Sequence, residues 1–380
     1  MTALTRRQVF NRTAAALTTS ILGGCAAAAE DAPRYTALAL QTKCDAVNQD
    51  KTRDDARARM MASLARIDGQ IGVSKAFLKT FNGTATRLVT LPEYFMTGFP
   101  LGESLPAWRD KAAIDPEGEE YARLAAMAEK HDIFLAGNAY ETDANFPELY
   151  FQTNFLISPA GKTVLRYRRL ISMYTPSPYD VWDKYLDLYG LDGVFPVAQT
   201  EIGAIAGIAS EEILYPEVAR CLAMRGAEIF FHPTSEVAAP KLTQKDIAKR
   251  ARAIENMAYV VSANTAEITG TPLPAASTDA MSKVVHYDGT VLASAESGES
   301  MTANALIDLP ALRAYRQRTG MSNFLARQPF QAYAESYADT VHAVPNGALR
   351  NGEVAPPSRG DIVARQRQVI EKLMADGVVR

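Results

Sequence analysis

The alternation of short apolar segments with amphipathic ones constrains the fold of this chain most. Residues 35–41, 87–95 and 133–141 are predicted strands, rich in apolar and β-branched residues. Between them, residues 51–72 and 118–132 carry apolar residues at helical spacing with charged residues on the other positions. The first half of the chain therefore predicts an α/β fold in which strands and helices alternate.

The second half repeats this rhythm. Predicted strands cover 202–209, 227–233 and 259–264, and predicted helices cover 215–226 and 242–257. Each half also contains one hairpin pattern. The first turns at Pro159-Ala160-Gly161, and the second turns at Asp288-Gly289. Strands that are partly helix-connected and partly hairpin-connected predict a mixed sheet covered by helices.

No low-complexity linker interrupts residues 35 to about 340, so we expect one domain over residues 35–335. Residues 336–380 are rich in Pro, Gly and polar residues at first, and we expect an extended C-terminal arm before a last short helix. The formal net charge of −3 gives no support for nucleic-acid binding. No internal segment has the roughly 18 apolar residues that a membrane helix needs.

The N-terminus has a different character from the rest of the chain. Arg6 and Arg7 precede a weakly apolar stretch that ends at Leu22-Gly23-Gly24-Cys25. This order resembles a twin-arginine export signal ending in a bacterial lipobox, with residues 1–25 as the signal and 26–34 as a tether. It implies an exported, periplasmic or cell-envelope protein that is lipid-anchored through Cys25. Two alternatives are a disordered leader and soluble release by cleavage near the alanines at 26–29.

The cysteine and histidine content does not predict a metal site. No CxxC or HxxxH spacing occurs, which argues against structural zinc, and we expect no cofactor. After Cys25, only Cys44 and Cys221 remain, and each is expected to be a buried or unpaired thiol.

Three polar residues stand at or just past predicted strand ends. Glu93 lies in "LPEYFMTGFP", Arg169 in "YRRLI", and Ser210 in "GIASEEILYPE". Taken singly, each has an ordinary structural explanation. Glu93 could cap a turn, Arg169 could be a solvated surface charge, and Ser210 could be a helix N-cap.

Their surroundings resemble the motifs of the nitrilase (carbon–nitrogen hydrolase) superfamily. "LPEYFMTGFP" resembles the first-glutamate motif, "SPAGKTVLRYRR" the lysine segment, and "IGAIAGIASEEILYPEVAR" the nucleophile segment. "RARAIENMAYVVSAN" matches the helix and strand that follow. The motifs occur in family order over about residues 35 to 335. The resemblance implies a single-domain αββα sandwich, paired into a homodimer or higher homo-oligomer, that acts on small amide, nitrile or carbamoyl compounds.

The family chemistry uses a glutamate base, a lysine and a cysteine nucleophile, and this chain departs from it at two positions. Glu93 matches the base, but Arg169 stands at the lysine position and Ser210 at the cysteine position. Neither Lys162 nor Cys221 is an obvious substitute. The family's second glutamate has no clear match.

That second glutamate has two weak candidates, Asp180 and Asp183.

The substitutions at positions 169 and 210 change the chemistry. A serine hydroxyl forms no useful anion and depends on a base during attack, whereas a thiol has a pKa of about 8.5. Arginine keeps the positive charge but cannot donate a proton as lysine can. We therefore favour a pseudoenzyme or ligand-binding protein of the cell envelope. The alternative is an active serine-variant hydrolase that uses Glu93, Arg169 and Ser210.

Overall fold

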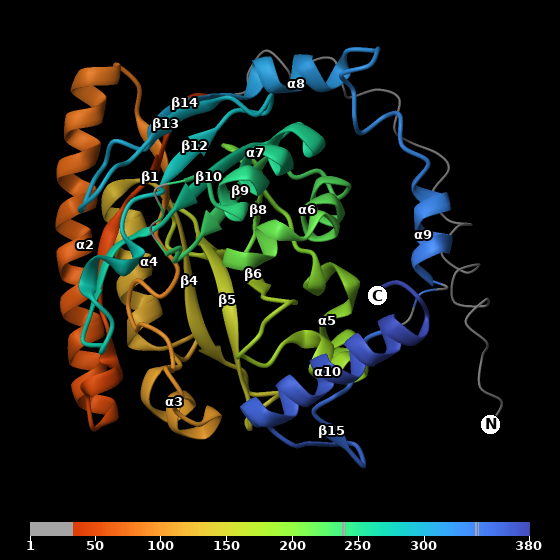
Figure 1. Ribbon diagram of the computed structural model, residues 1–380. Helices are drawn as coiled ribbons and strands as arrows, with labels where there is room; N and C mark the ends of the chain where they lie inside the picture. The colour runs from red at the N-terminus through yellow and green to blue at the C-terminus, as the bar shows by residue number, and fades with distance from the viewer. Residues whose placement is uncertain (1–32, 238, 240, 339, 341) are drawn as a thin grey trace.

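The computed structural model describes residues 33–237, 239, 241–338, 340 and 342–380. The predicted signal and Cys25 lie outside the described residues, as does most of the tether. Two six-stranded sheets form the centre of the molecule (Figure 1). The first has the order β14 (Asn304–Asp308), β1 (Arg34–Ala39), β3 (Thr86–Thr90), β4 (Phe134–Thr142), β5 (Tyr150–Ile157) and β6 (Thr163–Arg168).

The second sheet has a matching plan. Its order is β13 (Val291–Ser294), β12 (Lys283–Val285), β10 (Tyr259–Ala263), β9 (Ile229–Pro233), β8 (Gly203–Gly207) and β7 (Ala198–Thr200). In each sheet three central strands are parallel and the outer strands are antiparallel. The mixed sheet predicted from the helix connections and hairpins is therefore confirmed, and it occurs twice.

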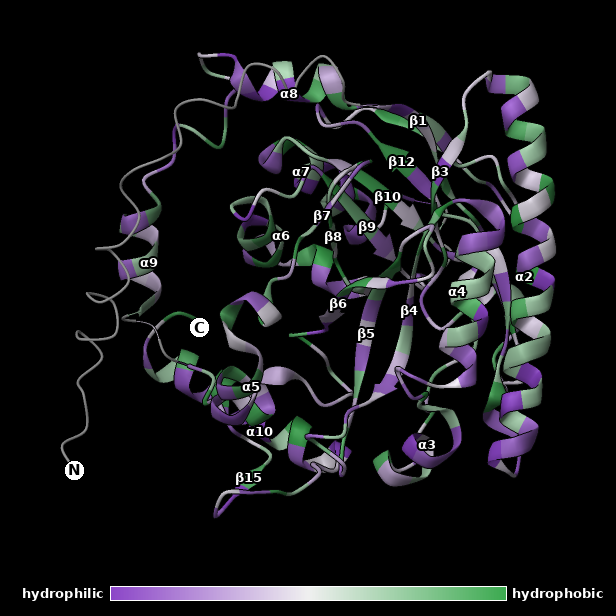
Figure 2. Ribbon diagram, turned by 180° about the vertical axis from the view of Figure 1, so that it is seen from behind, coloured by the Kyte–Doolittle hydropathy of each residue, from purple (hydrophilic) through white to green (hydrophobic). Residues whose placement is uncertain are grey.

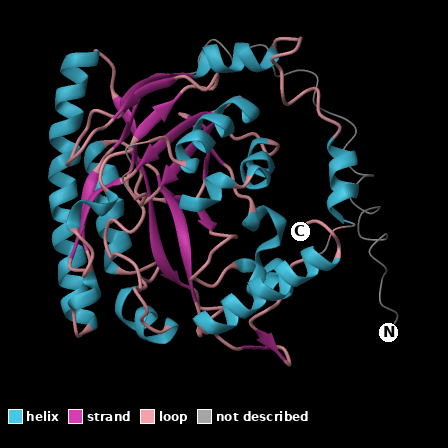
Figure 3. Cartoon of the chain, viewed as in Figure 1, coloured by secondary structure: helices cyan, strands magenta, loops and turns pink. Residues whose placement is uncertain are grey.

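Helices cover the outer faces of the two sheets. α2 (Arg53–Asn82) and α4 (Glu119–His131) lie on one side, and α6 (Pro216–Ala223) and α7 (Gln244–Asn256) lie on the other (Figures 1 and 3). Successive side chains of a strand point to opposite faces of its sheet, so they belong to two different hydrophobic cores. Ala37 faces the core shared by both sheets, while the next residue, Leu38, faces the core beneath α2 and α4. The αββα sandwich is confirmed.

α2 has 30 residues and ends ten residues later than the helix predicted over 51–72. Thr52 caps its start through the Asp55 amide, and Gly83 ends it in a left-handed conformation with φ 72°. Met60, Leu64 and further apolar residues along one face are buried, and the ribbon alternates hydrophobic and hydrophilic residues (Figure 2). The predicted helix ended too early, since the buried face of α2 continues as far as Leu78.

The remaining elements connect or flank the sandwich. They are β2 (Thr42–Asp45), which pairs with β11 (Thr265–Thr269), then β15 (Leu349–Arg350), β16 (Glu353–Val354), α3 (Leu105–Ala112), α5 (Trp182–Val194), α8 (Leu309–Gln317), α9 (Phe330–Ala338), α10 (Arg359–Ala375), and the 3-10 helices η1 (Val47–Gln49), η2 (Pro178–Val181), η3 (Ser210–Leu214) and η4 (Ala275–Thr278). The predicted last short helix is α10, with 17 residues. In the described part of the chain, no helix is both long and apolar enough to cross a membrane.

Candidate active site

Glu93 lies in the turn that follows β3 and is buried. The predicted strand over 87–95 is too long, because β3 ends at Thr90 and Pro92 cannot donate a ladder hydrogen bond. The Glu93 carboxylate accepts hydrogen bonds from Gln152 Nε2 at 2.7 Å and from Arg169 Nη1 at 3.3 Å. Its backbone amide donates to the carbonyl of Thr234 at 3.3 Å. The carboxylate therefore projects inward and does not cap a turn.

Arg169 is the first residue after β6 and is also buried. Besides Glu93, its guanidinium donates to Gln152 Oε1 at 2.7 Å and to the carbonyl of Ile171 at 2.7 Å. It also forms an ion pair with Glu211. Arg169 thus bridges the buried Glu93 and the partly exposed Glu211, and it is not a solvated surface charge.

Ser210 is the first residue of η3, directly after the end of β8. Its backbone is left-handed, with φ 45°, a conformation that is uncommon for a residue other than glycine. The N-cap of η3 is Ala209, so Ser210 does not have the predicted capping role. Its hydroxyl instead accepts a hydrogen bond from Lys245 Nζ at 3.0 Å, and its side chain is buried.

His232 of β9 fixes the backbone of Ser210. Its Nε2 donates to the Ser210 carbonyl at 2.8 Å, and its Nδ1 lies 2.8 Å from the Ser262 hydroxyl. Burial, together with the nearby Lys249 ammonium, holds the pKa of His232 well below its ordinary value. A neutral imidazole with the proton on Nε2 satisfies both contacts, so His232 supports the turn and does not carry a charge into the site.

Glu212 joins the end of β6 to the turn that carries Ser210. Its carboxylate accepts from the amides of Leu170 and Ile171 at 2.8 and 2.9 Å, and from the Tyr167 hydroxyl at 2.8 Å. It also accepts from the Ala209 amide at 3.3 Å. Burial raises the pKa of Glu212 to about 7. This carboxyl group therefore positions Arg169 beside η3.

The structure brings the three predicted residues into one region. Glu93 contacts Arg169 directly, and Arg169 pairs with Glu211, the neighbour of Ser210. Lys245 Nζ reaches both Ser210 and the Thr234 hydroxyl, at 3.3 Å in the second case. Among the described residues, no hydrogen bond joins the Ser210 hydroxyl to Glu93 or to Arg169.

Four further residues of the site were not predicted from the sequence: Gln152, Glu211, Glu212 and Lys245. Gln152 had a visible signal, since it is a polar residue inside the apolar strand "YFQTNFLI". Glu211 and Glu212 follow Ser210 directly, but nothing in the sequence says which of them faces inward. Lys245 had no such signal, because a lysine in the first turn of a charged helix is ordinarily solvated.

The weak candidates for a second acidic residue lie elsewhere. The Asp180 carboxylate accepts from Ser177 and pairs with Arg365 of α10 at 2.6 Å. The backbone of Asp183 donates to the Asn346 side chain. The second carboxylate on Arg169 comes instead from Glu211. Cys221 lies on α6 as a free thiol, and Cys44 is free and buried.

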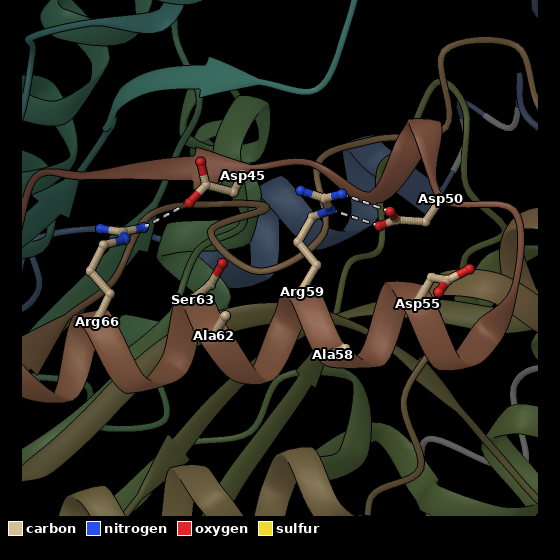
Figure 4. Close-up of a pocket in the computed structure, with 8 residues that line it drawn as sticks. All are labelled: Asp45, Asp50, Asp55, Ala58, Arg59, Ala62, Ser63 and Arg66. Carbon is tan, nitrogen blue, oxygen red and sulfur yellow. Dashed lines mark hydrogen bonds and ion pairs between the residues drawn. The ribbon is translucent and has the colours of Figure 1, made fainter.

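Two surface pockets are separate from this region. One of about 540 Å³ lies beside α2 and is shown in Figure 4 with its ion pairs Arg59–Asp50 and Arg66–Asp45. The other, of about 280 Å³, lies along β6 and α5. Neither is lined by Glu93, Arg169 or Ser210. In the described part of the chain, no group of three or more His, Cys, Asp or Glu residues is arranged to hold a metal ion.

Two six-stranded sheets packed between helices, with Glu93 and Arg169 buried beside the Ser210 turn, define a protein of the αββα-sandwich class. The family model for carbon-nitrogen hydrolases matches residues 56–317, more than half of the chain. The chain belongs to the carbon–nitrogen hydrolase family, as its motifs predicted.

Similar proteins include nitrilases and amidases. The rice bifunctional nitrilase/nitrile hydratase NIT4 is 29% identical over 200 residues, covering 48% of this chain and 51% of that protein. The Pyrococcus abyssi nitrilase is 26% identical over 213 residues, covering 55% and 73%. The match thus spans about half the length of the rice relative.

Solved structures show the same fold. The carbon–nitrogen hydrolase of Helicobacter pylori G27 has a TM-score of 0.60 at 21% identity, covering 80% of this chain and 99% of that one. A cysteine-to-serine variant of the Nesterenkonia AN1 amidase has a TM-score of 0.55 at 19% identity, covering 80% and 98%.

Proposed function

We propose that this protein is an exported carbon–nitrogen hydrolase-like protein that binds a small amide, nitrile or carbamoyl compound without hydrolysing it by the cysteine chemistry of its family. In the Nesterenkonia amidase, acrylamide adds at the active site cysteine. Here the aligned motif has Ser210, and the lysine position has Arg169. The proposal extends the family membership to a specific role for this chain.

One observation carries the proposal. The Ser210 hydroxyl is held by an ammonium donor, Lys245, while the nearby carboxylate of Glu93 is engaged by Arg169 and Gln152. A serine nucleophile needs a base that takes its proton during attack. Among the described residues, the Glu93 carboxylate makes no hydrogen bond to the Ser210 hydroxyl, so it is not placed to take that proton. The arrangement therefore favours binding over turnover.

A serine-variant hydrolase is the second candidate, and the backbone of Ser210 favours it. A left-handed nucleophile on a strand-to-helix turn is the geometry of a nucleophile elbow, and strained residues gather at functional sites. In this case Glu93 would be the base, and Arg169 would stabilise the intermediate. Glu93→Ala and Ser210→Ala would each abolish its activity.

Turnover assays separate the two candidates. A panel of amides, nitriles and N-carbamoyl compounds is tested on the wild type, Ser210→Cys and Ser210→Cys/Arg169→Lys. We expect no turnover by the wild type and measurable turnover by the double variant, in which Glu93→Gln then abolishes it. Wild-type turnover that is lost in Glu93→Ala would contradict the binding role. The binding role also predicts ligand-induced thermal stabilisation of the wild type without turnover.

Export and anchoring are proposed from the N-terminal sequence. The Arg6-Arg7 pair and the Leu22–Cys25 segment support a twin-arginine route with lipidation at Cys25. We expect Arg6→Lys/Arg7→Lys to keep the protein in the cytoplasm of a bacterial host. Cys25→Ala should abolish labelling by radioactive palmitate. Equal envelope fractions for the double-lysine variant and the wild type would contradict the route.

We also propose that the protein forms a homodimer or a higher homo-oligomer. Apolar side chains on the outer face of α6 and α7 support this proposal, because Met224 and Ile247 are 50% and 58% exposed and Ile254 is 36% exposed. Light scattering coupled to size-exclusion chromatography measures the mass directly. A monomer at micromolar concentration would contradict the proposal.

A further inference from the structure

Lys245 differs from the other cations around the site because no carboxylate neutralises it at close range. Among the residues that the structure describes, no carboxylate oxygen lies within the 4.0 Å ion-pair distance of its Nζ. Its recorded partners are two hydroxyls, those of Ser210 and Thr234. The side chain is half-buried on the first turn of α7, so the ammonium is only partly hydrated.

The acidic groups nearby already have cationic partners. Glu93 and Glu211 both pair with Arg169, and Glu236 pairs with the fully buried Lys249. Glu236 also accepts a hydrogen bond from Thr243. The ammonium of Lys245 therefore remains as the cation without a close counter-ion beside the Ser210 hydroxyl.

The hydroxyls beside Lys245 suit an anionic ligand. Ser210 and Thr234 are buried, with 4% and 0% exposure, and each accepts from Lys245 in this structure. A hydroxyl that accepts from an ammonium still has its own proton to donate. Two such protons and one ammonium form a set of donors that a carboxylate satisfies better than a neutral amide, because charge-assisted hydrogen bonds are the stronger ones.

We propose that Lys245, with Ser210 and Thr234, forms a subsite for the carboxylate group of a small organic acid. The inference rests on the proposed function, since it names the ligand class of that same binding site. It reverses the preference expected of an amide-cleaving enzyme: this site should retain the free acid more tightly than the corresponding amide.

Matched acid and amide pairs test the subsite. Propionate and propionamide, benzoate and benzamide, and succinate and succinamate are titrated against the protein by calorimetry. We expect the acid of at least one pair to bind about tenfold or more tightly than its amide, which is the change in Kd for one charge-assisted hydrogen bond. Lys245→Met should remove this preference, and Lys245→Arg should largely keep it.

Lys241→Met is the matched control, because it removes the same charge from an exposed residue four positions earlier. It should leave the preference unchanged. Lys245→Gln is the second variant if Lys245→Met lowers the melting temperature. Three results would overturn the inference. They are equal or tighter binding of the amides, an unchanged preference for the acid in Lys245→Met and Lys245→Gln, and binding of neither member of any pair. Amide turnover by the wild type would contradict the proposed function instead, and inhibition by the free acids would then test the subsite.

Discussion

At the scale of single residues, the site is a set of buried charges that depend on one another. Glu93 and Arg169 are both nearly inaccessible to solvent, and each satisfies the other. Breaking a buried ion pair from one side is costly, because it leaves a charge without compensation in a medium of low polarity. The sequence alone suggested both residues but gave no means of telling that they touch.

Arg169→Met should lower the free energy of unfolding by about 3–5 kcal/mol, because it leaves the buried Glu93 carboxylate without its cation. The double variant Arg169→Met/Glu93→Gln should lose less than the sum of the two single losses, since it removes both charges together. Urea unfolding of the four proteins measures this coupling. Strictly additive losses would show that the two groups do not stabilise each other.

Glu212 makes stability depend on pH. Burial raises its pKa from 4.5 to about 7 in the folded protein, so the folded state binds the proton more tightly than the unfolded state does. Its contribution to stability is fully present below pH 4.5 and is lost as the pH rises to about 7.

The free energy of unfolding of the wild type relative to Glu212→Gln should therefore fall across this range, by at most about 1.4 kcal/mol per pH unit. Denaturation curves at pH 5, 6, 7 and 8 measure the difference. A difference that is flat or rises with pH would contradict the raised pKa.

At the scale of elements, the strand ends and tight turns position the functional groups. The hydrophobic periodicity predicted the three parallel strands of each sheet and the covering helices α2, α4, α6 and α7, since burial of one face is a local property of the sequence. It did not predict where strands end in tight turns. Glu93 was assigned to a strand, but it lies beyond Thr90. The Ser210 turn depends on Glu212 within the same turn and on His232 from β9.

Gly207, the last residue of β8, lies three residues before Ser210 at a position with no room for a side chain. A Cβ there would lie 2.6 Å from Phe231 Cζ and 2.9 Å from Asn154 Nδ2. Gly207→Ala should therefore destabilise the protein by about 1–3 kcal/mol through overpacking.

The control for this substitution is Gly69→Ala, on an exposed position of α2 with no atom within 4 Å of the added Cβ. It should stabilise the protein by about 0.5–1 kcal/mol, because alanine suits a helix interior better than glycine. Thermal melts followed by circular dichroism compare the two variants. A melting temperature for Gly207→Ala at or above that of the wild type would show that Phe231 moves aside without cost.

At the scale of the whole molecule, the C-terminal arm packs against the segment from η2 to α5. Ala348 is fully buried in a cluster with Phe146, Val181 and Tyr185. Its amide donates to the carbonyl of Asp180 at 2.9 Å. α10 lies beside α5 (Figure 1) and adds the Arg365–Asp180 ion pair. The predicted boundary at residues 335 and 336 stays a prediction, but the arm has its own contacts with the domain.

Two truncations measure the contribution of the arm. Ending the chain at residue 357 removes α10 and should cost about 1 kcal/mol, the upper end for a surface ion pair, because the Arg365–Asp180 pair is partly buried. Ending it at residue 341 also uncovers the cluster around Ala348 and should cost at least about 2 kcal/mol more, through lost apolar burial. Urea unfolding compares the two proteins. Equal stability of both truncations would show that residues 342–357 contribute nothing to the fold.

The sequence by itself determined the family, the two repeated strand–helix halves, and the identity of the residues at positions 93, 169 and 210. These follow from local periodicity and from the order of the motifs along the chain. Only the tertiary structure decided which charges meet. Gln152, Glu211 and Lys245 enter the site from separate elements, because packing two sheets face to face brings together side chains that no local pattern relates. The ammonium beside Ser210, on which the proposed ligand class depends, is a property of that packing.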